Sequence, residues 1–275
     1  MHPQVEHMNR DTESMQCRPP AVAGAFYPGD PLALSAMVSE LLAAAKPMSL
    51  PHQPKAMVAP HAGYIYSGGV AAHGYRSLQP YADEIRRVIL LGPNHRVPLA
   101  GIAAPDVSCF RTPLGDIEID QEMISQLADK GLLQINSLPH HQEHCLETQL
   151  PFLQKLLSNW QLVPLVVGET AADDVAALLE EVIHEPGNIV IVSSDLSHFH
   201  EYHEAQRIDN HTSELIETLQ PVIHPQQACG AFPLNGLLQL AGRMGLRVIT
   251  LDRKNSGDTA GGKDQVVGYA SYAFV

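Results

Sequence analysis

Short apolar runs, rich in Val and Ile, recur along the chain from residue 55 onward and are separated by polar and turn-forming residues. Runs of this length without polar alternation are typical of strands that are buried on both faces of a sheet. The pattern therefore predicts strands at residues 55–59, 87–91, 101–104, 162–167, 188–192, 247–251 and 266–274.

Between these runs, apolar residues recur at helical spacing, and several of the segments carry capping residues at their ends. They predict helices at residues 31–45, 67–78, 120–130, 146–157, 171–184, 201–219 and 235–244. Alternation of strands and helices indicates an α/β fold with a mixed, mostly parallel central sheet flanked by helices. In such sheets a ligand binds outside the carboxyl ends of the strands.

No repeat, low-complexity linker or change of composition divides the chain, so we expect one domain over residues 18–275. Residues 1–17 are polar and lack both an apolar face and the hydrophobic core of a signal peptide, which predicts a disordered leader. The chain contains no run of 18 apolar residues, so no membrane span is expected.

The formal net charge of −13 argues against nucleic acid or an anionic membrane surface as the main partner. The four cysteines, Cys17, Cys109, Cys145 and Cys229, are widely spaced and form no CxxC pair. A chain of 275 residues buries a sizeable core without disulfides. We therefore expect reduced thiols and a cytoplasmic protein.

Histidine is over-represented, with 15 residues, and its position after strands is informative. Three predicted strands end in loops that carry histidine: His61 after the first, His95 after the second, and His198 and His200 after the run at 188–192. A single histidine in such a loop is more often a structural hydrogen-bonding group. The same placement after three strands favours convergence of the imidazoles at one edge of the sheet. Neutral imidazole is a common ligand of transition metals.

Two histidines alone leave a metal site incomplete, because a third anionic or soft donor is needed. The local sequence offers Asp195, Glu143, Glu147 and Cys229 as candidates and does not choose among them. Cys229 precedes a glycine, which permits close approach of the backbone to an ion. A small buried hydrophobic residue is the more common role of a cysteine.

A polar cluster at residues 140–147 precedes a leucine-rich helix and contains His144. Glu143 and Glu147 are four residues apart and share one face if the helix already includes Glu143. The cluster has two equally supported interpretations. It is either an acidic helix start favoured by the helix dipole, or a pocket wall that holds a metal-bound histidine by its outer ring nitrogen.

Together, these motifs resemble the Memo family. The resemblance runs in order from residue 18 to the end of the chain. It rests on residues 20–28 (PAVAGAFYP), 59–64 (APHAGY), 92–95 (GPNH), 143–147 (EHCLE), 194–198 (SDLSH), 229–230 (CG), 255–258 (NSGD) and 267–271 (VGYAS). Several separate blocks in order are far more specific than one short motif.

The Memo family is similar in fold to the class III extradiol, LigB-like, dioxygenases, which hold non-haem iron with two histidines and a carboxylate. The resemblance implies that His61, His95 and Cys229 are the metal ligands, with His198 as a pocket histidine and Asp195 beside it. A thiolate in place of the carboxylate argues against ring cleavage. It favours one copper or iron ion, with zinc as the alternative, over Mg²⁺ or Ca²⁺.

The first functional hypothesis is a copper- or iron-dependent oxidoreductase that acts on O₂ or a small reduced substrate. His198 would donate or accept the proton, and Asp195 would orient it. The second hypothesis is a zinc hydrolase in which His144, Glu143 or Glu147 is the general base. Fold similarity alone does not decide between them.

The third hypothesis is a non-catalytic module that grips a small molecule or peptide in the same pocket. Phe26, Tyr27, Tyr64 and Tyr66 are its candidate lining residues, although core packing is the more common role for aromatic residues. Serine hydrolase and nucleotide-binding functions are not indicated, because neither a G-x-S-x-G elbow nor a glycine-rich phosphate loop follows a predicted strand.

Overall fold

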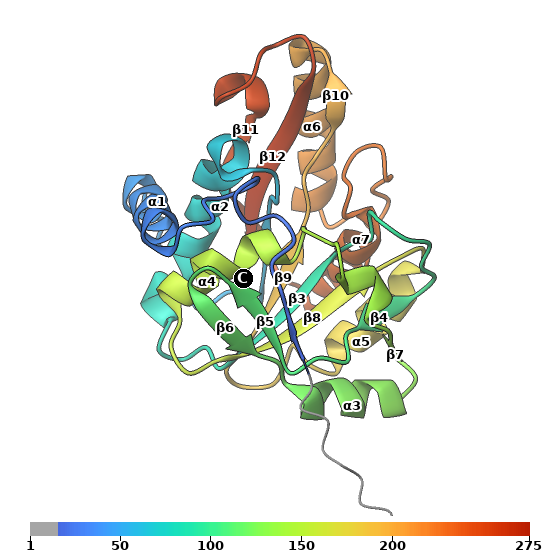
Figure 1. The fold of residues 1–275 in the computed structure, drawn as a ribbon. Helices are drawn as coiled ribbons and strands as arrows, with labels where there is room; N and C mark the ends of the chain where they lie inside the picture. The colour runs from blue at the N-terminus through green and yellow to red at the C-terminus, as the bar shows by residue number, and fades with distance from the viewer. Residues whose placement is uncertain (1–15) are drawn as a thin grey trace, which may run out of the picture.

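A mixed nine-stranded sheet forms the centre of the computed structural model, which describes residues 16–275 (Figure 1). Its strand order is β10-β12-β2-β9-β3-β8-β4-β7, and β11 pairs with β12. The strands are β2 (Ala56–Ala59), β3 (Arg87–Pro93), β4 (Ile102–Ala104), β7 (Gln134–Ile135), β8 (Gln161–Val167), β9 (Asn188–Ser193), β10 (His198–His200), β11 (Val248–Asn255) and β12 (Val266–Phe274). β2, β9, β3 and β8 run parallel, whereas β12 and β4 join them antiparallel.

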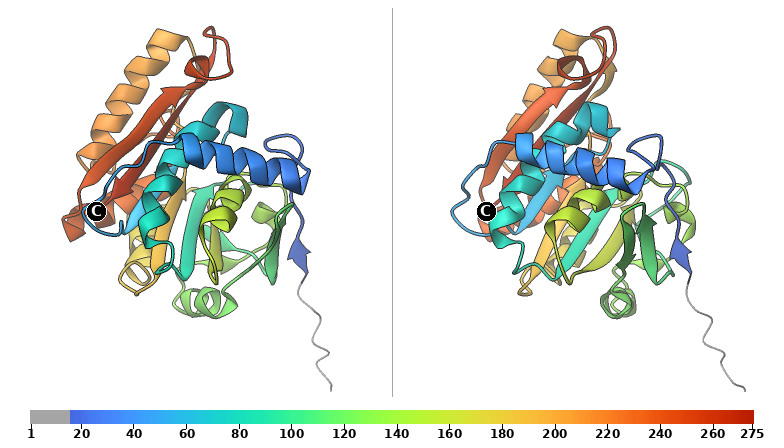
Figure 2. Two further views of the ribbon diagram at one scale, coloured as in Figure 1. Left: turned by 90° about the vertical axis from the view of Figure 1, so that its left-hand side faces the viewer. Right: turned by 60° about the vertical axis from the view of Figure 1, so that its left-hand side comes forward.

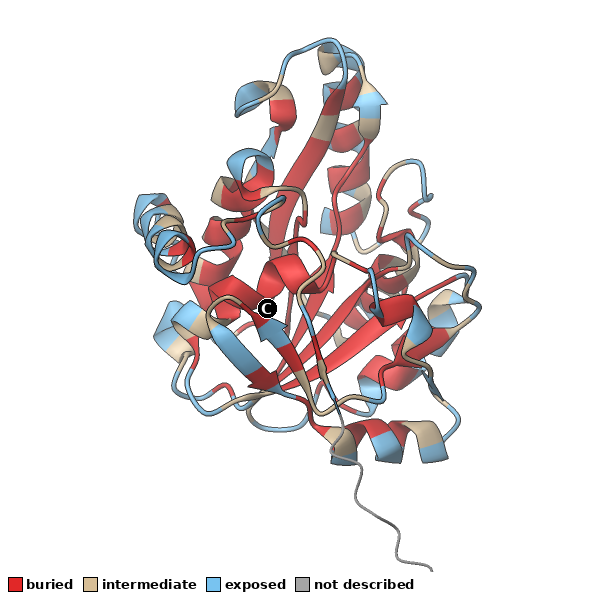
Figure 3. Cartoon of the chain, viewed as in Figure 1, coloured by how far each residue is buried: buried red, intermediate tan, exposed pale blue. Residues whose placement is uncertain are grey.

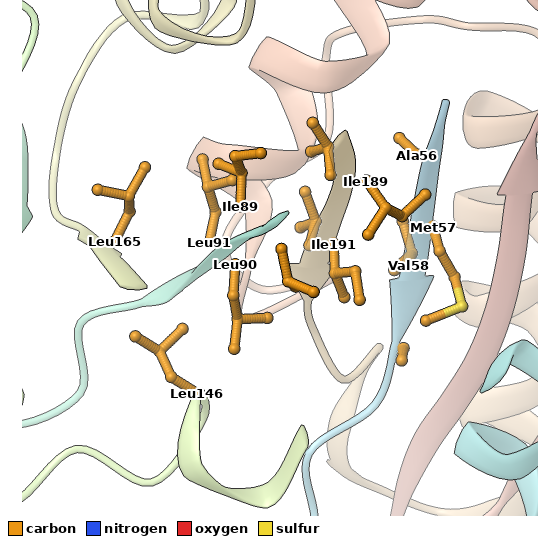
Figure 4. Close-up of a cluster of buried hydrophobic side chains, with 14 of the residues drawn as sticks. Ala56, Met57, Val58, Ile89, Leu90, Leu91, Leu146, Leu165, Ile189 and Ile191 are labelled. Atoms are coloured by element: carbon orange, nitrogen blue, oxygen red, sulfur yellow. The ribbon is translucent and has the colours of Figure 1, made fainter. Parts of the chain in front are cut away.

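The central strands are buried on both faces, which explains their continuous apolar runs (Figure 3). Ile189 and Ile191 of β9 lie between the side chains of β3 and those of β2 (Figure 4). Both isoleucines are fully buried. Because a buried Leu or Ile side chain contributes about 1.5–3 kcal/mol through removal from water, these strands hold the carboxyl edge of the sheet rigidly in place.

Helices cover both faces of the sheet (Figure 2). α2 packs on β2 and β12 and carries α1 and α4 on that side, whereas α5 and α7 pack on each other and α7 contacts β3 and β9. The helices are α1 (Pro31–Ala44), α2 (Tyr64–Leu78), α3 (Gln121–Asp129), α4 (Leu150–Leu156), α5 (Ala172–Glu180), α6 (Tyr202–Glu217) and α7 (Ala231–Met244). The short 3-10 helices are η1 (Gln79–Tyr81), η2 (Leu138–His140), η3 (Glu147–Gln149) and η4 (Ser256–Asp258).

This architecture confirms the predicted α/β class with a mixed sheet between helices. Helix starts with an acidic cap agree closely with the sequence: the side chains of Asp30 and Asp120 accept hydrogen bonds from Ala33 N and Met123 N. The starts of α2 and α7, which follow glycines and have no side-chain cap, were predicted three and four residues too late. In residues 16–275 no helix combines the length and the apolar character that a membrane crossing requires.

The same domain contains a second, three-stranded sheet of β1 (Cys17–Arg18), β5 (Cys109–Thr112) and β6 (Gly115–Glu118). The sequence did not predict it, because its strands are short and half polar. β1 pairs parallel with β5 so that Cys17 lies opposite Cys109, with 4.5 Å between their Cα atoms, and the two residues form a disulfide. The expectation of four reduced thiols was therefore wrong, and Cys145 and Cys229 are the free cysteines of the described residues.

Residues 1–15 of the predicted leader lie outside the described residues. Cys17, which the sequence placed at the end of that leader, belongs to β1 and carries the disulfide. The described fold thus begins slightly before the predicted boundary at residue 18.

Candidate metal centre

The parallel strands β2, β9 and β3 are direct neighbours, so their carboxyl ends meet at one edge of the sheet. His61 follows β2, His95 follows β3, and Asp195 and His198 follow β9. The prediction that these loops converge is confirmed. It holds because each strand consists of a buried apolar run that ends at the same level of the sheet.

His61, His95 and Cys229 form a candidate ligand group at this edge. One donor atom from each lies within 4.8 Å of the other two, and Cys229 Sγ is 3.3 Å from His61 Nε2. Cys229 reaches the site from the loop before α7. A Cβ at Gly230 would lie 2.6 Å from Ser194 Cβ, so a glycine is needed for this loop to pack on the end of β9.

The outer ring nitrogens of both histidines are bound by other side chains. His61 Nδ1 lies 2.9 Å from Ser193 Oγ, and His95 Nδ1 lies 2.9 Å from Glu143 Oε1. Glu143 Oε2 also accepts a hydrogen bond of 2.8 Å from His95 N. The Nε2 atoms are left for an ion, which is the arrangement in which outer partners orient histidine ligands.

The chemistry of these donors fits a transition-metal ion. Two imidazole nitrogens and one thiol sulfur suit copper, iron or zinc, whereas Mg²⁺ and Ca²⁺ prefer oxygen ligands. The three residues come from three separate loops: His95 lies 34 positions after His61 in the chain, and Cys229 lies 168 positions after His61. Convergence of soft donors over such separations is expected of a binding site and is unusual for local packing.

Burial sets the charge of this cluster. It lowers the pKa of His61 to about 3, and the neighbouring His95 lowers it further. Burial also raises the pKa of the Cys229 thiol, with an added contribution from Asp195. The residues alone therefore present a neutral imidazole and a protonated thiol. Binding of a cation would release the thiol proton, so metal affinity should rise with pH.

Glu143 is negatively charged despite its burial. Burial by itself would raise the pKa of the Glu143 carboxyl group, but hydrogen bonds from His95 and from backbone amides outweigh burial and hold the pKa below its usual range. Its Oε1 accepts hydrogen bonds from the amides of His144 and Cys145. A Cβ at Gly92 would lie 2.5 Å from Cys145 Sγ, so Gly92 lets β3 approach the loop that carries Glu143.

His144 completes a group of three imidazoles. Its ring is stacked on His95 at 4.9 Å between centroids and lies edge-on to His61 at 5.4 Å. Its Nδ1 is 3.3 Å from Glu143 Oε1. Phe26 packs against its other side at 4.9 Å. Burial, followed by the neighbouring His61, lowers the pKa of His144 to about 4.

Asp195 is bound to the His61 loop. Its Oδ1 accepts a hydrogen bond of 2.7 Å from His61 N, and its Oδ2 lies 3.9 Å from His61 Nε2. Burial raises the pKa of the Asp195 carboxyl group. Among the hydrogen bonds within residues 16–275, none joins Asp195 to His198. Asp195 is therefore hydrogen-bonded to the backbone of His61, and its electrostatic interaction with His198 holds its carboxyl pKa lower than burial alone would.

Two cavities of about 550 Å³ each meet at His198. The first is partly aromatic, and its lining includes Phe26, Tyr66, His144, Asp195, His198, Phe199 and Tyr269. The second contacts two of the three candidate ligands and is lined by His95, His198, His200, Pro225, Gln226 and Cys229. His198 is half-buried and reaches both cavities.

Four predicted pocket residues line neither cavity: Tyr27, Tyr64, Glu143 and Glu147. Glu147 is fully buried and bound to Arg18, Tyr27 and the backbone at Ala21, and it lines neither cavity. Tyr64 is buried and donates to a backbone carbonyl, and it also lines neither. Because the chain is helical only from Glu147 onward in this region, Glu143 and Glu147 do not share a helix face.

Sequence reasoning missed Arg18, Gln149 and Ser193. Arg18 is buried and donates to Glu147 and to the carbonyls of Glu143 and His140, which fixes the loop behind His95. Ser193 directly follows the predicted strand at residues 188–192 and was given no role in the site, and Gln149 lies within the predicted helix at residues 146–157. The sequence signal for Ser193 was its hydroxyl group at the end of an otherwise apolar, buried strand.

The fold and the site together define an α/β protein with a candidate metal centre of two histidines and one cysteine at the carboxyl edge of its sheet. Residues 18–273 match the family model described as Memo-like protein, and the chain belongs to this family. The resemblance seen in the sequence is thereby confirmed.

Relatives of the same family are similar to this chain over nearly their whole length. A MEMO1 family protein of Sulfolobus acidocaldarius is 36% identical, over 94% of this chain and 99% of that protein. One of Aquifex aeolicus is 34% identical, over 95% of this chain and 100% of that protein. A solved structure, the uncharacterized protein JW3007 of Escherichia coli K12, is 12% identical with a TM-score of 0.48, over 82% of this chain and 100% of that one.

Proposed function

We propose that this protein binds one transition-metal ion through His61, His95 and Cys229 and acts as a copper- or iron-dependent oxidoreductase on a small molecule. The observation that carries the proposal is the convergence of the three donors within 4.8 Å, with both outer ring nitrogens already bound. Ligands that are oriented in advance are characteristic of a site built for a metal.

A bound copper or iron ion would supply one-electron exchange with O₂ or a reduced substrate. The residues of the chain bind and orient that substrate and move its protons. The partly aromatic cavity of about 550 Å³ falls in the size range of small-molecule sites. A small molecule or a short peptide side chain therefore suits this cavity better than a folded partner.

His198 is the proposed proton donor or acceptor. It is the one candidate acid–base residue from the sequence that lines both cavities, so it reaches a ligand in either. Imidazole can both donate and accept a proton near neutral pH. Asp195 binds the His61 amide through Oδ1 and interacts electrostatically with His198, so it would support the proton transfer from nearby.

A zinc hydrolase is the second candidate, and the position of His144 favours it. Glu143 is bound to His95, and Glu147 is bound to Arg18, so neither is available as a general base. His144 lines the first cavity beside the candidate ligands, and it remains the base with access to a substrate there.

The test is metal analysis of protein purified without added metal, followed by anaerobic reconstitution with copper, iron or zinc. O₂ consumption with small reductants and hydrolysis of activated esters are then measured for each form. The oxidoreductase proposal expects O₂ consumption with copper or iron that is lost in His95→Ala and retained in His52→Ala, an exposed histidine outside the site. Ester hydrolysis with zinc, and no O₂ consumption with any metal, would replace it with the hydrolase.

A further inference from the structure

The hydroxyl group of Ser193 lies at the centre of a buried hydrogen-bond network behind His61. Ser193 Oγ is 2.9 Å from His61 Nδ1, 2.8 Å from Gln149 Nε2 and 2.6 Å from the carbonyl oxygen of Cys145. Ser193 and Gln149 are fully buried, and His61 is only 2% exposed. Every proton in this network must therefore come from the groups themselves.

The orientation of the Gln149 amide is fixed by two neighbours. Its nitrogen lies 2.9 Å from the carbonyl oxygen of Pro60, which can only accept a hydrogen bond. Its oxygen accepts a hydrogen bond of 2.7 Å from the hydroxyl group of Tyr75. Rotating the amide by half a turn would place two oxygen acceptors against each other at Pro60. Gln149 Nε2 is therefore the donor to Ser193.

Counting protons then fixes the state of His61. A serine hydroxyl has one hydrogen and can accept two hydrogen bonds. The carbonyl of Cys145 only accepts, so the Ser193 hydrogen points to it. Gln149 donates to one lone pair of the hydroxyl oxygen. The other lone pair faces His61 Nδ1, which must carry a hydrogen to complete the bond.

With a hydrogen on Nδ1, the Nε2 atom of neutral His61 carries a lone pair, and this atom lies 3.3 Å from Cys229 Sγ. We propose that Ser193, held by Gln149 and Tyr75, is a positioning residue that locks His61 in its Nδ1–H tautomer with Nε2 presented to the metal. This inference rests on the metal site proposed above, but the tautomer itself is a property of the metal-free protein.

The two histidine ligands are therefore held in the same tautomer by different partners. His95 donates its Nδ1–H to the carboxylate of Glu143, whereas His61 donates to a neutral hydroxyl group. A neutral partner adds no second negative charge on the buried side of the site, where Asp195 already lies near His61. Outer partners of this kind typically change metal affinity by roughly 10–100-fold when they are removed.

The first test is the ¹⁵N chemical shifts of the His61 ring in the metal-free wild-type protein at neutral pH. Nδ1 should carry the hydrogen, and Nε2 should not. An Nε2–H tautomer in the wild type would overturn the proposal. This readout does not depend on metal binding, so a protein that binds no metal but shows the Nδ1–H tautomer would contradict the proposed function and leave the positioning role intact.

The second test measures Zn²⁺ affinity, with zinc as a redox-silent probe. Ser193→Ala should lower the affinity roughly 10–100-fold, and Ser193→Thr, which keeps the hydroxyl, should restore most of it. Ser271→Ala is the matched control, because Ser271 is also fully buried and donates to a carbonyl, that of Val70, away from the site. Wild-type affinity in Ser193→Ala would refute the role.

Should Ser193→Ala fail to fold, Tyr75→Phe provides the milder change. It removes only the phenol oxygen that fixes the Gln149 amide. The ¹⁵N shifts of His61 in this variant should move toward a mixture of the two tautomers, with a smaller loss of Zn²⁺ affinity than in Ser193→Ala. Unchanged shifts would overturn the part of the proposal that assigns a holding role to Tyr75.

Discussion

Replacing Glu147 with Gln removes the negative charge of a carboxylate that is fully buried and surrounded by donors. Glu147 Oε2 accepts hydrogen bonds from Arg18 Nη1 at 2.8 Å and from Ala21 N at 2.7 Å, and Oε1 accepts from Tyr27 OH at 2.6 Å and from Val22 N at 3.0 Å. These bonds fasten the chain at residues 18–27 to the loop behind the metal centre.

The cost of Glu147→Gln follows from the partner that it leaves behind. The Arg18 side chain is 4% exposed, so its charge has no water to replace the carboxylate. Breaking a buried ion pair by removing one partner typically costs about 3–5 kcal/mol. At about 2–4 °C per kcal/mol for a large domain, the melting temperature should fall by roughly 6–20 °C. Because Glu147 lines neither cavity, Zn²⁺ should still bind to the folded variant with near wild-type affinity.

The assay is thermal unfolding followed by circular dichroism, with Asp116→Asn as the matched control. Asp116 forms an ion pair with Arg111 in which both side chains are exposed, and such pairs contribute little. Its loss should leave the melting temperature unchanged. If Glu147→Gln were no more destabilised than Asp116→Asn, or if it folded normally and lost metal, Glu147 would belong to the site and not to the scaffold.

Three further outcomes are expected. Cys17→Ser or Cys109→Ser should lower the free energy of unfolding by about 2–5 kcal/mol, since the disulfide closes a loop of 92 residues; equal stability of both variants and wild type would show that it does not form. His198→Ala should retain metal while changing the rate or pH dependence of the reaction, and a metal affinity as low as that of His61→Ala would make His198 a ligand. His140 is buried, and burial lowers its pKa to about 4 from an unfolded value near 6.5. The contribution of neutral, buried His140 to the free energy of unfolding is therefore complete above pH 6.5 and is lost as the pH falls toward 4, by up to roughly 3 kcal/mol. In denaturant titrations over that range, His140→Gln should lose stability less steeply than the wild type. Parallel curves for the two proteins would contradict this.

The sequence predicted the central strands well because each is buried on both faces and so consists of a continuous apolar run. The same property placed the loops of His61 and His95 correctly, since parallel neighbouring strands end at one edge. β1, β5 and β6 were missed because they are short and partly exposed. β1 pairs with β5 about 90 positions away, which periodicity does not record, whereas β5 and β6 form a local hairpin of two short strands.

For the site, local sequence could name the histidines but not the third donor. Cys229 reaches the histidines because Gly230 packs on Ser194, which is a contact between segments far apart in the chain. Before the structure, only the family resemblance singled out Cys229 as the third ligand. The separate roles of Glu143 and Glu147 depend on where the helix starts and on Arg18, which lies far away in the chain. Spacing of four residues suggested a shared face that the turn before η3 prevents.

The proposed metal site requires that His61, His95 and Cys229 together hold one ion. The most direct measurement is the metal stoichiometry of the folded wild type and of His61→Ala, His95→Ala and Cys229→Ala after identical loading and removal of free ion. We expect one ion per wild-type chain and near-complete loss of the ion in each variant, with unchanged circular dichroism spectra. Full occupancy in Cys229→Ala, or in either histidine variant, would contradict it.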